Sequence, residues 1–272
     1  MLLKQVRYVR PGTVAEAVQA LGEHENARPL AGGQTLINVM KVRAAAPDVL
    51  VDLADLGQLR QISRDPDGTL RVGAAATYAD VIGSSHVNEA RPVLAEVCAQ
   101  IADVQVRNRG TVGGNVCSSD PTNHLLPLVV ALGASMTIVG PEGERTVPAE
   151  EFFLGVYLTA AGPGELLTEV AFPAGAGADG FASVTIGRDG TCIANAAASL
   201  DGGTPRIALG CVAAVPELLL PGSADEDAVR EAVRNAELDP PSDVHAPADY
   251  RRHLAEVLAV LAVTRAAERG RA

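Results

Sequence analysis

Apolar residues recur at helical spacing in several parts of the chain. Between Thr13 and Gly22 they fall every three or four positions, and Glu16 stands three residues after Thr13, as in a capping box. Gly22 follows the last apolar position, so a short amphipathic helix is predicted there. Helical spacing also predicts helices over 92–103 and 121–132. A last helix is predicted from four apolar residues on one face: Leu254, Val257, Leu258 and Leu261.

Between these segments lie runs with the character of β-strands. Strands are predicted over 47–53, 70–76, 134–139, 194–200 and 207–215. Helices and strands are mixed without a repeating βαβ period. The run 172–180 is rich in small residues and is the best candidate for a linker, so we expect a domain boundary there. The segment after it is expected to form an α+β domain.

Length and composition describe an ordinary globular protein. With 272 residues, of which 47% are hydrophobic, the chain can bury a sizeable core and form two or three compact units. Its net charge of -11 argues against nucleic acid as a partner, because clustered lysine and arginine bind phosphate backbones. Charged residues interrupt the N-terminus, and no apolar run is long enough to span a bilayer. We therefore expect no signal peptide, no membrane span and a cytoplasmic location.

The cysteines and histidines give no sign of a metal centre or of a hydrolase. The chain has four cysteines that stand far apart, without a C-x-x-C pair: Cys98, Cys117, Cys192 and Cys211. We therefore expect no zinc or iron–sulfur site within this chain, and four reduced, mostly buried thiols. No motif such as G-x-S-x-G places a nucleophile, so no catalytic residue is assigned. Arg251 and Arg252 are interpreted as surface charges in preference to contacts with a partner subunit.

Two loops carry adjacent glycines followed by a side-chain amide. The first is 31–35 (AGGQT), and the second is 107–115 (RNRGTVGGN). Adjacent glycines permit positive φ and leave no Cβ in the way, so peptide N–H groups can converge on an anion. Neither loop has the G-x-G-x-x-G or G-x-x-x-x-G-K-[ST] spacing of the standard nucleotide-binding motifs. Taken singly, each is most simply a tight turn. Together, they leave turns and a dinucleotide diphosphate site about equally supported.

These loops resemble the two signature loops of the FAD-binding middle subunit of molybdenum hydroxylases. That family includes the flavoprotein subunit of aerobic carbon monoxide dehydrogenase and the flavin domain of xanthine dehydrogenase. The first loop is followed by 40–43 (MKVR), and the second by the step Asp120-Pro121. The similarity extends to 164–170 (GELLTEV) and 250–254 (YRRHL), so it covers nearly the whole chain.

The resemblance implies an α+β fold with a defined division of the chain. Residues 1–173 would form an FAD-binding domain of the PCMH type, with two α/β subdomains over about 1–55 and 56–173. Residues 174–272 would form a C-terminal α+β domain like that of the carbon monoxide dehydrogenase flavoprotein. An extended FAD would lie between the two subdomains.

The resemblance also implies an activity, that of an FAD-dependent oxidoreductase with partner subunits. FAD would accept electrons from iron–sulfur clusters on a small subunit, which receives them from a molybdenum cofactor on a large subunit. The flavin would then pass them to an external acceptor, and the assembly would be a dimer of heterotrimers. Two alternatives stay open: a free-standing FAD-dependent dehydrogenase or oxidase that acts directly on a small substrate, and a degenerate scaffold that has lost FAD.

Carried over residue by residue, the resemblance assigns the diphosphate to the backbone of the first loop. The other side of the diphosphate and the ribose would be held by the C-terminal part of the second loop, residues 111–115. The expected cofactor-binding residues are Leu30, Ala31, Gly32, Gly33, Gln34, Thr35, Leu36, Ile101, Thr111, Val112, Gly113, Gly114, Asn115, Asp120, His124 and Leu167. Ile101 and Leu167 would contact apolar parts of FAD. In related flavin folds a histidine at the position of Gln34 can be linked to the flavin. Glutamine has no such nucleophilic nitrogen, so we expect non-covalent FAD.

Four residues downstream of the second loop either allow more than one interpretation or differ from the residue that is usual in the family. Asp120 either accepts a hydrogen bond from a sugar hydroxyl or caps a helix that begins at Pro121. His124 stands where relatives usually carry an aspartate, and it either contacts ribose or adenine or is a partly exposed helix histidine. Phe181 and Asn195 fall nearest the places where relatives often carry a tyrosine and a lysine close to the flavin.

Overall fold

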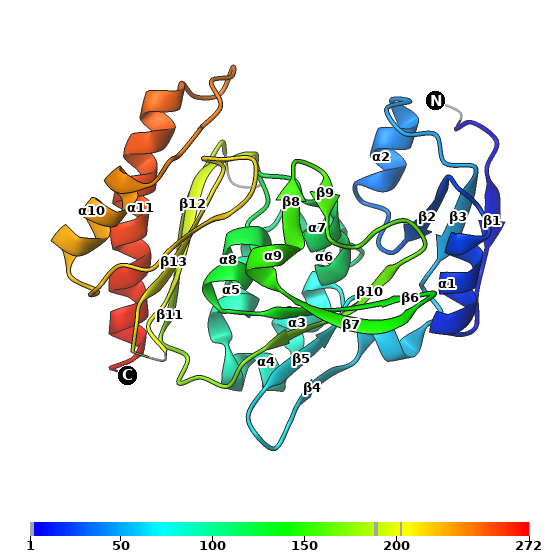
Figure 1. The fold of residues 1–272 in the computed structure, drawn as a ribbon, viewed down its shortest axis with the longest axis horizontal. Coiled ribbons are helices and arrows are strands. Elements are labelled where there is room, and N and C mark those ends of the chain that lie inside the picture. Colours follow the sequence, from blue (N-terminus) through cyan, green and yellow to red (C-terminus); the bar gives the residue numbers. More distant parts are fainter. Residues whose placement is uncertain (1–2, 188–189, 202, 272) are drawn as a thin grey trace.

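A computed structural model describes residues 3–187, 190–201 and 203–271. Three parts follow one another along the chain, from a small lobe at the N-terminus through a central part to a sheet covered by two helices (Figure 1). Helices and strands are mixed throughout, which agrees with the predicted α+β class.

The first lobe is a three-stranded parallel sheet in the order β1-β3-β2. Its elements are β1 (Arg7–Val9), α1 (Val14–Gly22), β2 (Ala27–Leu30), α2 (Leu36–Lys41) and β3 (Val49–Asp52). The helix predicted after Thr13 is confirmed, and the Thr13 hydroxyl accepts from the Glu16 N–H at 3.1 Å. The Glu16 carboxylate accepts from Gly12 N–H rather than from Thr13. β3 is the central strand and is buried along its whole length, so its side chains do not mark a single buried face.

The central part is built on a five-stranded antiparallel sheet in the order β4-β5-β10-β6-β7. Its strands are β4 (Ile62–Arg64), β5 (Leu70–Gly73), β6 (Ser135–Gly140), β7 (Gly143–Pro148) and β10 (Leu166–Phe172), beside a hairpin of β8 (Phe153–Gly155) and β9 (Leu158–Thr159). Its helices are η1 (Gly57–Arg60), α3 (Tyr78–Gly83), α4 (Ser85–Ala90), α5 (Pro92–Gln100), α6 (Val104–Arg107), α7 (Val112–Ser118), α8 (Leu125–Ala131) and α9 (Ala149–Phe152). The helices predicted over 92–103 and 121–132 correspond to α5 and α8.

The C-terminal part is an antiparallel sheet in the order β11-β12-β13-β14 with α10 and α11 packed on it. Its elements are β11 (Asp179–Thr185), β12 (Cys192–Ser199), β13 (Arg206–Gly210), β14 (Glu217–Leu219), α10 (Glu226–Asn235) and α11 (Ala248–Arg269). The sequence prediction missed β11 and β14. The run 173–178 joins β10 to β11, and the largest core cluster continues across it to Phe181, Ala197 and Ala208. A boundary near 173 therefore stays a prediction.

The face predicted for the last helix is partly wrong. Leu254 and Leu258 are buried, but Val257 and Leu261 are 38% and 37% exposed. The buried stripe is instead completed by small residues: Ala255, Ala259, Ala262 and Ala266. They let α11 approach the sheet so closely that a Cβ on Gly180 would lie 2.0 Å from the Ala262 carbonyl oxygen.

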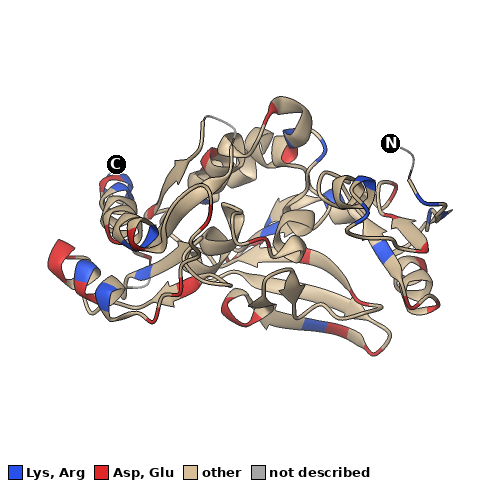
Figure 2. Ribbon diagram, turned by 90° about the horizontal axis from the view of Figure 1, so that it is seen from above, with Lys and Arg blue, Asp and Glu red and all other residues tan. Residues whose placement is uncertain are grey.

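The surface reading of Arg251 is also wrong. This side chain is buried and donates hydrogen bonds to the Ile193 carbonyl oxygen and the Asp243 carboxylate. Elsewhere, Lys and Arg are distributed among Asp and Glu over many elements instead of gathering on one face (Figure 2). Within the described ranges, none of the helices combines the length and the apolar character needed to cross a membrane.

Candidate cofactor-binding site

The first glycine loop joins the end of β2 to the start of α2. Gly33 has a φ of +72°, a conformation that glycine adopts without strain. Five successive N–H groups, those of residues 32–36, have no acceptor in the described part of the chain. The Thr35 hydroxyl is exposed and caps no backbone group of α2. Neighbouring N–H groups without acceptors are what a bound anion requires, so this loop fits a phosphate.

The second glycine loop leads into α7 and is bonded differently. Val112 N–H donates to the Ala76 carbonyl at 3.0 Å, and Gly113 N–H donates to the Ala74 carbonyl at 2.8 Å. Gly114 N–H donates to the Thr111 hydroxyl oxygen at 3.0 Å. These amides are therefore already paired within the protein. The Thr111 hydroxyl can still donate its own proton to another acceptor. The second loop can therefore bind an anion through a side chain, whereas the first loop can bind one through its backbone N–H groups.

Most glycines of the second loop are required by packing inside the protein. A Cβ on Gly110 would lie 2.6 Å from the Tyr78 ring, and one on Gly113 would lie 2.5 Å from the Ala74 side chain. Gly114 is exposed, and a Cβ there would lie 2.8 Å from the Thr111 hydroxyl oxygen. The glycines thus seat α7 against the end of β5 and against α3.

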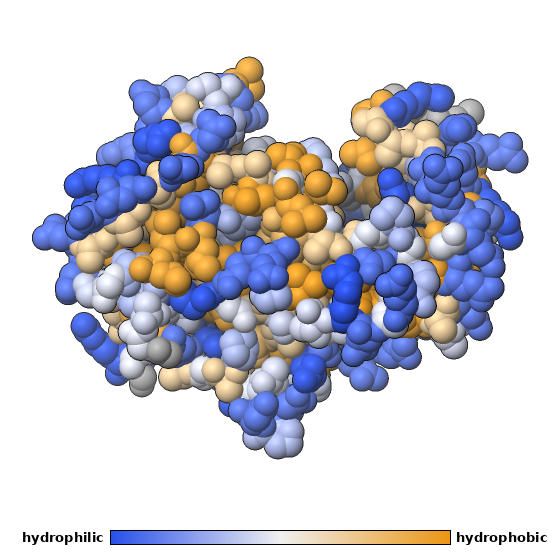
Figure 3. All heavy atoms as spheres, in the orientation of Figure 1, coloured by the Kyte–Doolittle hydropathy of each residue, from blue (hydrophilic) through white to orange (hydrophobic). Residues whose placement is uncertain are grey.

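The two loops are in direct contact although they are far apart in the sequence. A Cβ on Gly32 would lie 2.0 Å from the Arg109 carbonyl oxygen and 2.9 Å from the Gly110 Cα. Ala31 in turn lies 3.9 Å from the position of a Cβ on Gly114. The surface is hollowed between the lobe that carries α2 and the central part that carries α7 (Figure 3). The fold therefore brings the two glycine loops together at one site.

Tyr78 belongs to this site and is not predicted from the sequence. The Asn115 side-chain amide donates to the Tyr78 hydroxyl at 2.9 Å, and both residues are buried. Burial raises the pKa of the Tyr78 phenol, which therefore stays protonated. Asn115 Oδ1 has no partner in the described structure. The Thr77–Asp80 capping box signals the start of α3, but no local pattern signals a contact with a residue in α7.

Asp120 does not cap a helix. One of its carboxylate oxygens accepts from the Thr122 N–H at 2.9 Å and from the Thr122 hydroxyl at 2.8 Å, which closes a turn. α8 begins only at Leu125, so the alternative of an N-cap before Pro121 is wrong. The residue is partly exposed, and its second oxygen accepts no hydrogen bond from the described residues.

His124 is buried, so the reading of a partly exposed helix histidine is wrong. It is 7% exposed, and its ring lies 5.6 Å from the Phe181 ring, measured between centroids. Burial lowers the pKa of His124 to about 4, so the imidazole is neutral near pH 7. Its Nε2 has no hydrogen-bond partner within the described ranges.

The two apolar positions differ in accessibility. Ile101 is half-buried at the C-terminal end of α5. Leu167 lies in the core of the central sheet and is 3% exposed. Little of the Leu167 side chain is therefore left for a cofactor. Leu30 and Leu36, which flank the first loop, are half-buried.

All four cysteines are free thiols, and three of them are buried, as predicted. Asn195 Nδ2 lies 3.3 Å from the Cys192 sulfur and 3.8 Å from the Cys211 sulfur. Burial raises the pKa of the half-buried Cys117 thiol to about 12. In the part of the chain that the structure describes, His, Cys, Asp and Glu nowhere form a group of three suited to a metal ion.

Comparison with known proteins identifies the family. The family described as FAD binding domain in molybdopterin dehydrogenase matches residues 4–175. The carbon monoxide dehydrogenase medium chain of Afipia carboxidovorans is 39% identical over 281 residues, which cover 97% of each chain.

Solved structures agree over almost the whole chain. A chain of the Cu,Mo-CO dehydrogenase in its cyanide-inactivated form superposes with a TM-score of 0.92 at 37% identity, covering 99% of this chain and 100% of that one. A chain of quinoline 2-oxidoreductase from Pseudomonas putida 86 superposes with a TM-score of 0.90 at 32% identity, covering 98% and 99%. The chain therefore belongs to the FAD-binding family of the molybdopterin dehydrogenases, which confirms the resemblance of its two glycine loops, FAD as its cofactor and its class as an oxidoreductase.

Proposed function

We propose that this chain is the FAD-binding electron-transfer subunit of a heteromeric molybdenum hydroxylase. It accepts electrons from iron–sulfur clusters on a small partner subunit and passes them to an external acceptor, while a large partner carries the molybdenum cofactor. Two relatives that match at least 95% of this chain support the role, since they are named as a medium chain and a medium subunit: those of carbon monoxide dehydrogenase and nicotine 6-hydroxylase. The expected assembly is a dimer of heterotrimers in the cytoplasm.

The contact between the two glycine loops carries this proposal. Residues 32–36 present five N–H groups that have no acceptor among residues 3–187, 190–201 and 203–271, and Gly32 packs on the backbone that leads into α7. The diphosphate of FAD needs several converging donors, and amides supply them without adding a charged side chain. When bound, FAD supplies the two-electron and one-electron chemistry that no side chain of the protein provides.

The other residues of the site have distinct roles in this arrangement. The hydroxyls of Thr35 and Thr111 donate to phosphate or ribose oxygens, and the partly exposed Asp120 accepts from a sugar hydroxyl. His124, which is neutral, forms part of the wall, and Ile101 offers an apolar edge. The remaining assigned residues shape the loops and hold α7 in place: Leu30, Ala31, Gln34, Leu36, Val112, Gly113, Gly114, Asn115 and Leu167.

We further propose the domain division given by the sequence. Residues 1–173 form the FAD-binding domain, with subdomains over about 1–55 and 56–173, and residues 174–272 form the C-terminal domain. The separate sheets of the three parts support this division.

Native purification of the protein from its source tests the proposed function. The expected preparation is yellow, contains iron and molybdenum in stoichiometric amounts and includes two further chains. A yellow protein that oxidises a small substrate by itself, without iron or molybdenum, would instead establish a free-standing flavin dehydrogenase. A colourless protein that stays colourless after incubation with FAD would show a scaffold that has lost its cofactor.

A further inference from the structure

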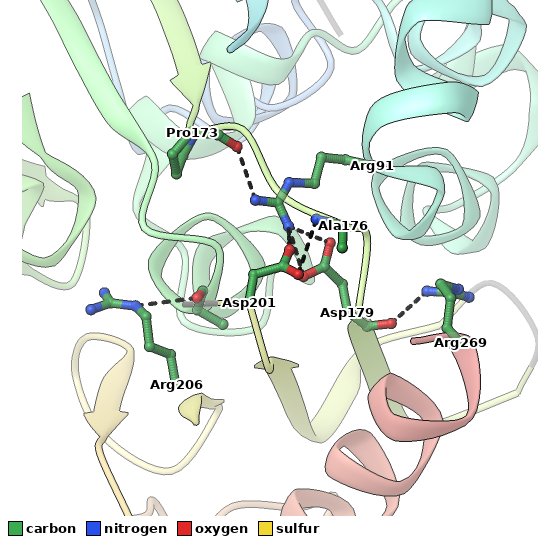
Figure 4. Close-up of polar contacts among 8 residues, drawn as sticks. Arg91, Pro173, Ala176, Asp179, Asp201, Arg206 and Arg269 are labelled. Carbon is green, nitrogen blue, oxygen red and sulfur yellow. Dashed lines mark hydrogen bonds and ion pairs between the residues drawn. The ribbon is translucent and has the colours of Figure 1, made fainter. Parts of the chain in front are cut away.

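A buried arginine lies where the central part meets the C-terminal sheet. Arg91, at the N-terminal end of α5, is 2% exposed. Its Nη1 donates to both carboxylate oxygens of Asp179, at 2.9 and 2.8 Å, and to the carboxylate of Asp201. Its Nη2 donates to the Pro173 carbonyl oxygen at 2.9 Å (Figure 4). We call Arg91, Asp179 and Asp201 the arginine clasp.

The arginine clasp holds residues 173–178, which connect the central part to the C-terminal sheet, through several hydrogen bonds. Pro173 begins the connection, Asp179 begins β11, and Asp201 follows the end of β12. The second carboxylate oxygen of Asp201 accepts from the Ala176 N–H at 3.1 Å, in the middle of the connection. A Cβ on Gly175 would lie 2.3 Å from Arg91 Nη2, so the connection packs directly on the clasp. The orientation of β11 and β12 is therefore tied to α5.

Two further arginines of the C-terminal part cross the same boundary (Figure 4). Arg206, on β13, donates to the carbonyl oxygens of the last turn of α8, at 3.1 and 3.3 Å, and to Glu150 at 2.7 Å. Arg269, near the end of α11, donates to the Asp179 carbonyl oxygen at 2.6 Å and to both carboxylate oxygens of Glu96 at 2.7 Å. Both are more exposed than Arg91, so the clasp is the buried centre of this boundary.

The clasp sets one guanidinium between two carboxylates. Burial raises the pKa of Asp179, and the neighbouring guanidinium of Arg91 opposes that rise. Without Arg91, the buried Asp179 carboxylate would lose the one cation partner that it has among the described residues. A cavity of about 350 Å³ beside the clasp is lined by Arg91 and Arg206 and equally by Glu150 and Asp201. Because these charges cancel, the cavity is not suited to an anionic ligand.

The sheet that the clasp holds also contacts the predicted cofactor segment. Phe181, on β11, packs against His124 with ring centroids 5.6 Å apart. The Asn195 side-chain amide, on β12, lies 3.5 Å from the Asn123 carbonyl oxygen. A shift of β11 and β12 would therefore move the side chains that pack against residues 120–124. In the proposed function, Asp120 accepts a hydrogen bond from a sugar hydroxyl of FAD and His124 forms part of the wall of the site.

We propose that Arg91 is a positioning residue for FAD. Through Asp179 and Asp201 it holds β11 and β12 against residues 120–124, and so it fixes the wall of the cofactor site without touching FAD. The inference rests on the proposed function, because that function places FAD beside residues 120–124.

The full chain with Arg91→Gln, and separately with Asp201→Asn, tests this role. Arg230→Gln is the matched control, since Arg230 also pairs with two carboxylates, those of Glu226 and Glu256, but on the surface of α10 and α11. The measurements are the FAD dissociation constant, iodide quenching of bound flavin fluorescence and the melting temperature. Arg91→Gln is expected to weaken FAD binding about tenfold and to increase quenching, because the freed sheet no longer closes the wall. Asp201→Asn should shift both readouts less, and the control should shift neither.

The outcomes separate a positioning role from a purely structural one. Lower melting temperatures with unchanged FAD affinity and quenching would overturn the inference, because the clasp would then stabilise the fold alone. If Arg91→Gln does not fold, Asp201→Asn decides by the same criteria. Failure of the unchanged chain to bind FAD would overturn the proposed function itself, and this inference with it.

Discussion

The two glycine loops meet at Gly32, so one added methyl group there tests whether they act as a clamp. A Cβ on Gly32 would lie 2.0 Å from the Arg109 carbonyl oxygen, 2.7 Å from its carbon and 2.9 Å from the Gly110 Cα. These are backbone atoms, so they cannot rotate away as the end of a flexible side chain would. The loops would have to separate by about 1 Å to relieve the 2.0 Å contact.

The expected size of the effect comes from the cost of this overpacking. Forcing one extra carbon into a closely packed site costs about 1–3 kcal/mol. If FAD requires the loops at their present spacing, that cost appears in binding, where about 1.4 kcal/mol corresponds to tenfold in affinity. Gly32→Ala is therefore expected to weaken FAD binding about 5- to 140-fold.

Titration of the apoprotein with FAD, followed by flavin fluorescence, measures this change. Gly22→Ala is the control, because Gly22 ends α1 and a Cβ there meets no atom within 4 Å. The control should bind FAD as the unchanged chain does. Wild-type affinity in a folded Gly32→Ala chain would refute the reasoning, because the contact between the loops would then be irrelevant to the cofactor.

Flavin content, acid stability and intact mass provide three more tests. Gly33→Val, which strains a residue at φ +72°, and Gly114→Val, whose side chain would crowd the Thr111 hydroxyl, should each abolish FAD retention, whereas the exposed Asp225→Ala should not. Because burial lowers the pKa of His124 from 6.5 to about 4, the folded state resists a proton that the unfolded state accepts. The contribution of neutral His124 to the free energy of unfolding should therefore be fully present above about pH 6.5 and should fall by up to about 3 kcal/mol toward pH 4. Urea unfolding at several pH values measures this loss, and His124→Gln should remove it. The denatured protein should have the mass of the chain alone, and a flavin-sized increment would contradict non-covalent binding.

Local patterns predict several elements of the fold. The capping signal at Thr13 and the helical spacing after Pro92 correspond to α1 and α5, because caps and helical faces depend on residues within a few positions of each other. The same patterns fail for the last helix. Val257 and Leu261 look like core residues, yet half of the buried residues of α11 are alanines. Small residues are favoured on this face of α11 because the sheet that packs against it also carries small side chains. That sheet is distant in the sequence, so a local pattern does not reveal it.

The sequence by itself determines the chemistry of the two glycine loops. Adjacent glycines with a following amide and threonine are local, and together with the segments that share the resemblance they indicate the family and FAD. Only the tertiary structure decides how the loops are used. It pairs amides of the second loop within the protein, and it places Gly32 on the Arg109 backbone. It also leaves the amides of residues 32–36 without an acceptor in the part of the chain that the structure describes.

Tertiary structure also decides which polar groups are buried. The sequence leaves His124 either as a ligand contact or as a partly exposed histidine, and no local pattern marks Arg91 as buried. In the structure the C-terminal sheet packs against His124, and Asp179 and Asp201 surround Arg91. Burial of a polar group depends on segments that approach from far along the chain. Periodicity and spacing report only neighbours within a few residues, so they determine elements and motifs but not these contacts.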